Sequence, residues 1–119
     1  MEQMSVQMQQ QIAQFQVAQQ QAQAISSQKV QTELQLKEME RTIEELDGLK
    51  KGAEVYKSIG TLLIKGDKAK INAELKENQE TLELRVKTLQ KQEKKIQAKL
   101  TEMQKTIQDG IKSGLPQAG

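Results

Sequence analysis

The side chains that most often carry enzyme chemistry are absent from this sequence. It contains no His and no Cys, so the usual general bases, nucleophiles and soft metal ligands are missing. No Gly-rich phosphate-binding loop occurs either. The carboxylates are spread along amphipathic segments with lysines as neighbours, a pattern typical of surface ion pairing. We therefore expect a protein that is not an enzyme and that needs no metal and no cofactor.

Basic side chains gather in one segment, where they could bind an acidic partner. From residue 85 to residue 99 a single acidic residue, Glu93, stands among six basic ones: Arg85, Lys87, Lys91, Lys94, Lys95 and Lys99. This run is either a solvated helix face, which we favour, or a docking stripe for an acidic protein. No aromatic residue interleaves it, so nucleic acid is not an expected partner.

Two long segments of the chain follow a heptad repeat. In each segment eight of ten seam positions are apolar. The first seam consists of Phe15, Ala18, Ala22, Ile25, Lys29, Thr32, Leu36, Met39, Ile43 and Leu46. The second consists of Leu75, Gln79, Leu82, Val86, Leu89, Glu93, Ile96, Leu100, Met103 and Ile107. A strict period of seven predicts supercoiled helices.

Helix signals divide the chain into four parts. Asp47 and Gly48 mark the end of a first helix, over residues 1–47, and Asp67 is a plausible N-cap for a second, over residues 67–112. Residues 48–66 form a linker and a hairpin between them, and residues 113–119 form a short tail. Residues 1–35 contain fourteen Gln, which would suit disorder, but the heptad running through them favours helix.

The two seams are in phase for antiparallel pairing within one chain. If the chain folds back on itself, the residue numbers of two paired seam residues add up to a constant. For both alternating sets of seam layers that sum is 118, as for Ala22 with Ile96. Lys29 and Glu93 fall in adjacent layers. They either pair across the seam or each extend to water and fix the register, and we favour the second.

The segment between the helices, EVYKSIGTLLIKG over residues 54–66, has the composition of a β-hairpin. Its proposed assembly residues are Val55, Tyr56, Ile59, Gly60, Leu62, Leu63 and Ile64. Gly60 suits a tight turn that needs positive φ. The hairpin is expected to be apolar on both faces, which one small chain cannot cover. Hairpins of several chains could close into an intersubunit β-barrel, which also removes exposed strand edges.

The free ends of the helices carry more apolar residues than one seam can hide. The residues expected to form an apolar binding surface at these tips are Met1, Met4, Val6, Met8, Ile12, Phe15, Ile107, Ile111 and Leu115. Val17 also lies off the heptad. Such a Met-rich surface is adaptable and suits promiscuous binding, whereas the alternative is a frayed terminus with scattered apolar residues.

No apolar run approaches the roughly 20 residues of a membrane span, and the N-terminus lacks the basic-then-apolar order of a secretion signal. A soluble cytoplasmic protein is the expectation. The fold class expected from these features is mainly α: a long antiparallel intramolecular coiled coil with a single β-hairpin at its base.

The chain resembles a β-class prefoldin subunit of the archaeal type over essentially its whole length. Three blocks carry the resemblance in the right order: QQIAQFQVAQQQAQAISSQK, the hairpin VYKSIG with LLIK, and LELRVKTLQKQEKKIQAKLTEMQKTIQ. Members of the α class have two hairpins, so a single hairpin implies the β class.

The resemblance implies a hexamer of two α and four β subunits with a double β-barrel body. Such a complex captures unfolded proteins between its tips and delivers them, without ATP, to a group II chaperonin. The expected partners are therefore α-class prefoldin subunits, unfolded client proteins and the chaperonin, with no membrane partner. The alternative is a structural coiled-coil scaffold or tether that its hairpin oligomerises.

Overall fold

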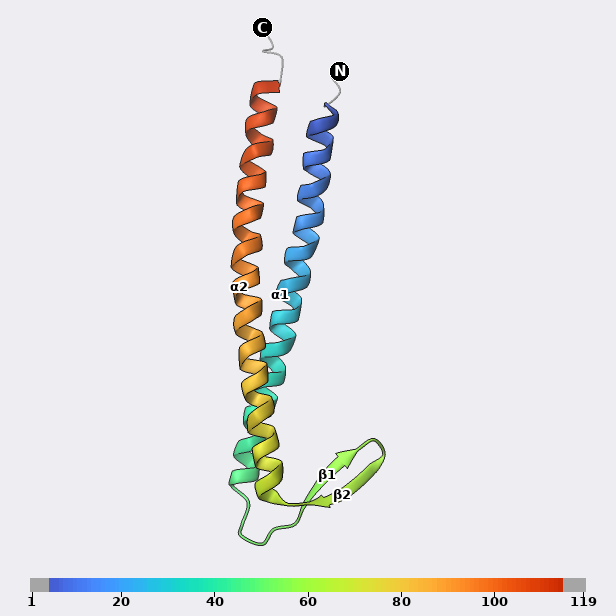
Figure 1. Ribbon diagram of the computed structural model, residues 1–119, viewed down its shortest axis with the longest axis vertical. Coiled ribbons are helices and arrows are strands. Elements are labelled where there is room, and N and C mark those ends of the chain that lie inside the picture. The colour runs from blue at the N-terminus through green and yellow to red at the C-terminus, as the bar shows by residue number, and fades with distance from the viewer. Residues whose placement is uncertain (1–4, 115–119) are drawn as a thin grey trace. The chain divides into compact units, whose positions relative to one another are not determined.

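The computed structural model describes residues 5–114 of the chain. Four elements follow one another: helix α1 (Val6–Asp47), strands β1 (Val55–Ile59) and β2 (Leu62–Gly66), and helix α2 (Lys68–Gly114) (Figure 1). Two long helices flanking a single antiparallel hairpin confirm the expected fold class. The Gln-rich segment is helical from Val6 onward, so the favoured interpretation of that composition is also confirmed.

Polar side chains satisfy the free backbone groups where the helices begin. The Ser5 hydroxyl accepts a hydrogen bond from the Met8 backbone N–H at 3.0 Å, at the start of α1. The Asp67 carboxylate accepts one from the Ala69 N–H at 3.0 Å, which confirms Asp67 as the N-cap of α2. Gly48 directly follows α1, as predicted. The cap at Ser5 was not predicted.

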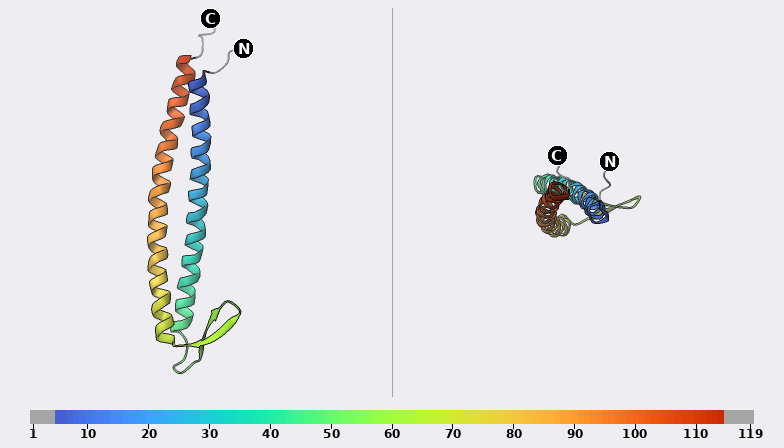
Figure 2. Two further views of the ribbon diagram at one scale, coloured as in Figure 1. Left: turned by 45° about the vertical axis from the view of Figure 1, so that its right-hand side comes forward. Right: turned by 90° about the horizontal axis from the view of Figure 1, so that it is seen from above.

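The chain divides into two compact units. Unit 1 contains residues 1–29 and 89–119, and unit 2 contains residues 30–88. Both helices contribute a stretch to each unit. Within each unit the two stretches run antiparallel, side by side (Figure 2). All twenty predicted seam positions are buried or half-buried.

The core of unit 1 lies between the two helix stretches. Ala18, Ala22 and Ile96 are buried together, and three half-buried side chains pack against them: Ile25, Leu100 and Met103. The small Ala side chains let the helices approach closely. The membership of these residues in one cluster agrees with the constant-sum prediction, which pairs Ala22 with Ile96 and Ala18 with Leu100.

Lys29 and Glu93 form an ion pair across this seam. The Lys29 Nζ lies 2.6 Å from the Glu93 Oε1, and the two side chains are 22% and 25% exposed. The favoured prediction, that each would extend separately to water, is therefore wrong. The reason is that the attraction between two opposite charges is stronger where they are partly shielded from water than where they are fully exposed at the surface.

Removing one charge of this pair should cost stability. We expect Lys29→Met to lower the free energy of unfolding by about 1–2 kcal/mol, because Glu93 then stays partly buried without its cation. The double variant Lys29→Met with Glu93→Leu should recover most of the loss. The control is Lys57→Met in the exposed Lys57–Glu74 pair, where about 0–1 kcal/mol is expected. Urea unfolding followed by circular dichroism measures all three, and equal losses at Lys29 and Lys57 would contradict the prediction.

The core of unit 2 continues the same heptad pattern. The helix stretches of this unit bury Thr32, Ile43 and Leu46 of α1 and Val86 of α2. At the end nearest the hairpin, the Asn72 side-chain amide donates a hydrogen bond to the Asp47 carboxylate. This contact links the last residue of α1 to the first turns of α2.

The hairpin of unit 2 has a two-residue turn at Gly60 and Thr61. Its register pairs Val55 with Gly66, Lys57 with Ile64, and Ile59 with Leu62. Gly60 has a φ of +58°, the left-handed conformation that the turn requires and that the sequence predicted. In Figure 1 the hairpin extends to one side of the helix pair of its own unit.

Candidate functional site

The two faces of the hairpin differ in chemistry. Directly paired residues share a face, so the register places five side chains on one face: Val55, Lys57, Ile59, Leu62 and Ile64. The opposite face carries Tyr56, Ser58, Leu63 and Lys65. Both faces therefore carry apolar side chains, as predicted, because neighbouring residues point opposite ways. Ser58 and Lys65 make the second face mixed, so the first face is the more apolar of the two.

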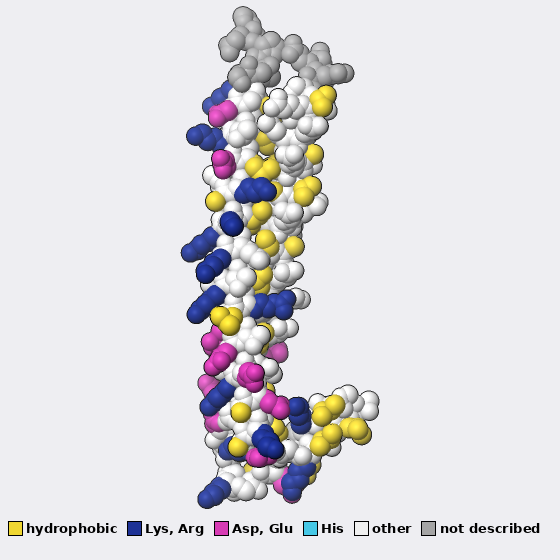
Figure 3. Space-filling view, viewed as in Figure 1, with side chains coloured by type: hydrophobic (Ala, Val, Ile, Leu, Met, Phe, Trp, Pro, Cys, Tyr) yellow, Lys and Arg dark blue, Asp and Glu magenta, His cyan; other side chains and the backbone are white. Residues whose placement is uncertain are grey.

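The apolar side chains of the hairpin are open to solvent. Tyr56, Ile59, Leu62, Leu63 and Ile64 are all exposed large residues, and Leu63 is the most exposed at 72%. Figure 3 shows hydrophobic side chains gathered over this element. Such a patch on a two-stranded sheet is typical of an interaction site, because a lone hairpin is marginally stable and leaves both strand edges unpaired.

Ion pairs and a hydrogen bond hold the base of the hairpin. The Lys57 Nζ lies 2.7 Å from the Glu74 Oε2 of α2, which links β1 to that helix. On the mixed face, the Tyr56 hydroxyl donates to the Glu54 Oε2 at 2.6 Å, and the Lys65 Nζ lies 3.6 Å from the Glu54 Oε1. The hydrogen bond to Glu54, with a smaller effect of desolvation, raises the pKa of Tyr56 above 10.0. Sequence reasoning missed these contacts, since no spacing rule connects Lys57 to Glu74.

The predicted tip residues lie at the ends of α1 and α2 in unit 1. Val6 is 70% exposed and Ile111 is 41% exposed. Met8, Ile12, Phe15 and Ile107 are half-buried. A Cβ at Gly110 would lie 2.5 Å from the Met8 terminal methyl, so Met8 lies against the backbone of α2. Met1, Met4 and Leu115 lie outside the described residues.

The six residues of the predicted docking stripe all lie on α2 and are all exposed. Arg85 and Lys87 belong to unit 2, and the four lysines belong to unit 1. Of the four, Lys95 and Lys99 line a groove beside the seam, described below. An acidic partner for the whole stripe stays a prediction.

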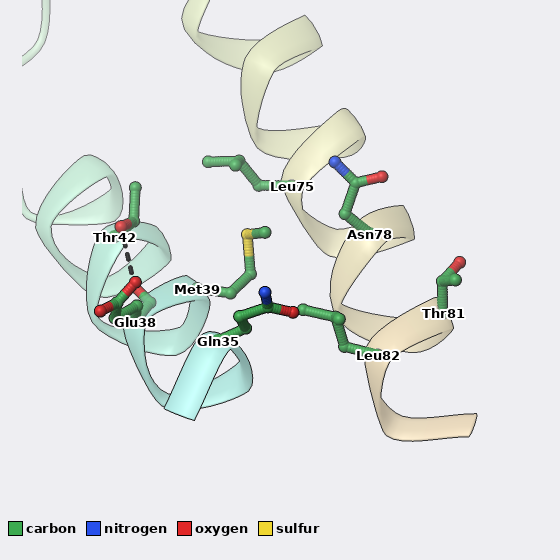
Figure 4. Close-up of a pocket in the computed structure, with 8 residues that line it drawn as sticks. All are labelled: Gln35, Glu38, Met39, Thr42, Leu75, Asn78, Thr81 and Leu82. Atoms are coloured by element: carbon green, nitrogen blue, oxygen red, sulfur yellow. Dashed lines mark hydrogen bonds between the residues drawn. The ribbon is translucent and has the colours of Figure 1, made fainter. Parts of the chain in front are cut away.

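Each unit carries a groove between its two helix stretches. The groove of unit 2 has a volume of about 480 Å³ and is drawn in Figure 4. Its lining residues are Gln35, Glu38, Met39, Thr42, Leu75, Asn78, Thr81 and Leu82. The Thr42 hydroxyl donates to the Glu38 carbonyl at 2.8 Å, so that hydroxyl is turned back onto its own helix. Unit 1 has two adjoining hollows of about 490 and 210 Å³.

Residues 5–114 contain no group of three or more His, Cys, Asp or Glu side chains that could hold a metal ion. In the same described part of the chain, neither helix is apolar enough over a sufficient length to cross a membrane.

Known proteins share this combination of paired helices and an exposed hairpin. The model of a family described as "Prefoldin subunit" matches residues 9–114. The chain belongs to the prefoldin family. The prefoldin subunit beta of Methanothrix thermoacetophila is 43% identical over 113 residues, which is 95% of this chain and 94% of that protein. The prefoldin subunit beta of Thermococcus onnurineus is 42% identical over 113 residues, covering 95% of both chains.

Solved prefoldin structures agree with the fold. The crystal structure of the prefoldin beta subunit from Thermococcus strain KS-1 superposes with a TM-score of 0.82 at 41% identity, over 92% of this chain and 96% of that one. The beta2 subunit from the same strain has a TM-score of 0.67 at 22% identity, over 76% of this chain and 97% of that one, and supports the fold alone. The resemblance to an archaeal-type β-class prefoldin subunit is therefore confirmed. Prefoldins are chaperones rather than enzymes.

Proposed function

We propose that this chain is the β subunit of a cytoplasmic prefoldin that holds unfolded proteins without ATP. In this proposal two α-class and four β-class subunits form a hexamer. The hexamer captures unfolded or nascent chains at its helix tips, prevents their aggregation and passes them to a group II chaperonin. The observation that best supports the proposal is the exposure of apolar side chains at two separate places: the hairpin of unit 2 and the helix ends of unit 1.

The hairpin is the assembly element in this proposal. Its more apolar face, with Ile59, Leu62 and Ile64, would be buried against strands of neighbouring subunits in a barrel. Its unpaired edges would be satisfied by the same strands. Sheet formation between subunits would therefore bury the exposed side chains and hydrogen-bond the free backbone groups.

The helix ends are the client-binding element. Exposed Val6 and Ile111, together with half-buried Met8 and Phe15, offer flexible and apolar contacts. Each fully buried apolar side chain contributes about 1.5–3 kcal/mol, and the costs of association cancel much of that. One subunit should thus bind an unfolded chain weakly. Several subunits around one client convert later contacts into intramolecular ones and raise the avidity by about 10² to 10⁴.

The test is an aggregation assay with a chemically unfolded protein. The full-length chain, assembled with an α-class prefoldin subunit, is added at the moment of dilution from denaturant, with no nucleotide present. We expect light scattering from the diluted protein to be suppressed at stoichiometric amounts of complex. A complex that assembles but leaves scattering unchanged would contradict the holdase proposal and favour the scaffold or tether.

A further inference from the structure

Unit 1 carries a groove beside its core that the tips and the hairpin do not explain. Its two hollows adjoin because both include Lys99. The floor is apolar and consists of seam residues: Ala18, Ile25, Ile96 and Met103. The exposed side chain of Val17 stands at its edge. An apolar floor that opens to solvent on a helix pair is a surface on which a further chain can dock.

The wall of the groove on α1 carries two amide side chains. Gln14 and Gln21 line it one heptad apart, and both are exposed. Their spacing along the helix is about 10.5 Å, which is close to the length of three residues of extended chain. A Gln side chain has two N–H donors and one carbonyl acceptor. The wall can therefore hydrogen-bond the backbone of an extended peptide without reading its side chains.

The opposite wall, on α2, is positively charged. Lys95 and Lys99 line it, and none of the described lining residues of this groove is acidic. The part of α1 that lines the groove contributes no charge, because residues 13–25 contain no Asp, Glu, Lys or Arg. A carboxylate entering the groove thus meets two cations and no anion among the residues that line it. The groove of unit 2 differs, since Glu38 is among its lining residues.

The length of the groove limits what fits. Ala13 and Ile25 lie at its two ends on α1, twelve residues apart, which corresponds to about 18 Å of helix. An extended chain advances about 3.3 Å per residue, so about five residues span the groove.

We propose that this groove binds an extended segment, about five residues long, of an unfolded protein in which apolar side chains are accompanied by Asp or Glu. The proposal rests on the proposed function and names the chemistry of the client segment. Apolar side chains contact the floor, Gln14 and Gln21 hydrogen-bond the backbone, and Lys95 and Lys99 pair with the carboxylates. The groove then adds a second contact to a client already held at the tips and favours acidic over basic segments.

Two labelled peptides test the preference. One is a peptide of about ten residues built from Leu, Gly, Ser and two Asp, and its twin carries Lys in place of both Asp. Binding to the full-length chain, alone and assembled with an α-class subunit, is followed by fluorescence anisotropy. The groove variant is Lys95→Glu with Lys99→Glu. The matched control is Lys91→Glu with Lys94→Glu, which changes the net charge equally at exposed positions of the same helix.

The groove variant should bind the acidic peptide about tenfold more weakly and should come to prefer its basic twin, because both cations become anions. The control should change either affinity by no more than about threefold, through longer-range and screened interactions. Equal losses of affinity for the acidic peptide in the two variants would mean that the general positive charge of the helix, and not the groove, attracts the peptide. That result would overturn the proposal.

A second measurement locates the peptide. Because the sequence contains no Cys, an environment-sensitive dye can be placed at Gln21→Cys alone or, as a control, at Gln23→Cys. We expect the acidic peptide to shift the emission at position 21 and not at position 23. If aggregation is suppressed but the emission at position 21 does not shift, the proposal that the groove binds the peptide is overturned and the holdase proposal stands. If the complex neither binds the acidic peptide nor suppresses aggregation, the groove proposal and the holdase proposal are both overturned.

Discussion

Replacing Ile64 with Asp is expected to abolish assembly with an α-class partner while leaving the helices intact. Ile64 lies on the more apolar face of the hairpin, opposite Lys57 in the register. In the isolated chain the side chain is exposed, so the substitution should cost the monomer little. In the barrel it would leave a carboxylate buried between subunits, which costs several kcal/mol unless the group is paired. Because this cost would be repeated in each β subunit, we expect it to prevent assembly.

Light scattering coupled to size-exclusion chromatography measures the effect, with circular dichroism as the check on helicity. We expect Leu63→Asp to abolish assembly as well, although Leu63 lies on the mixed face, because it is the most exposed apolar residue of the hairpin. Thr61→Asp, in the turn, is the control and should assemble normally. A complex of unchanged mass with Ile64→Asp would show that the hairpin is not the assembly element.

Making the helix ends polar should remove client binding without affecting assembly. The variant Val6→Ser with Ile111→Ser replaces two exposed apolar side chains in unit 1. Because both contacts are lost in every β subunit of a complex, their effects multiply through avidity, and we expect about tenfold more complex to be needed for equal suppression of aggregation. Deleting residues 1–8 together with 108–119 should remove most of the remaining suppression.

The matched control for the tips is Leu34→Ser with Leu84→Ser. These residues are 56% and 63% exposed, and they lie in unit 2, whereas Val6 and Ile111 lie in unit 1. The control therefore removes as much exposed apolar surface without touching the tips. Aggregation assays at matched concentration and moderate salt compare the two variants, since hydrophobic capture should persist where exposed charges are screened. Equal losses in both would mean that general surface hydrophobicity, and not the tips, holds the client.

The helices and their pairing could be predicted from the sequence because a coiled coil has a one-dimensional pattern. The alternation of apolar residues at three and four positions identifies the seam, and the matched phase of Ala22 and Ile96 identifies its antiparallel sense. The turn at Gly60 could be predicted for a similar reason, since positive φ restricts the residue type strongly. Each of these signals is local or strictly periodic.

The remaining features depend on contacts that no period encodes. The inequality of the hairpin faces follows from the register, because a shift by one residue would exchange the faces of every side chain in one strand. The ion pair of Lys29 with Glu93 depends on how deeply each side chain lies in the seam. The groove of unit 1 arises where Gln and Lys positions beside the seam come to face one another. The heptad spacing of Gln14 and Gln21 and the basic stripe with Lys95 and Lys99 are both visible in the sequence, but the groove that these side chains line together is not.

Photo-crosslinking at single sites tests the central claim, that the helix ends hold unfolded protein, most directly. Because the chain has no native Cys, a benzophenone label can be attached at Val6→Cys, Ile111→Cys or Leu84→Cys alone. Each labelled chain is assembled with an α-class subunit, mixed with a chemically unfolded protein during dilution, and irradiated. Our account predicts crosslinks to the client from positions 6 and 111 and none from position 84. Crosslinks from position 84 with none from positions 6 and 111 would contradict it.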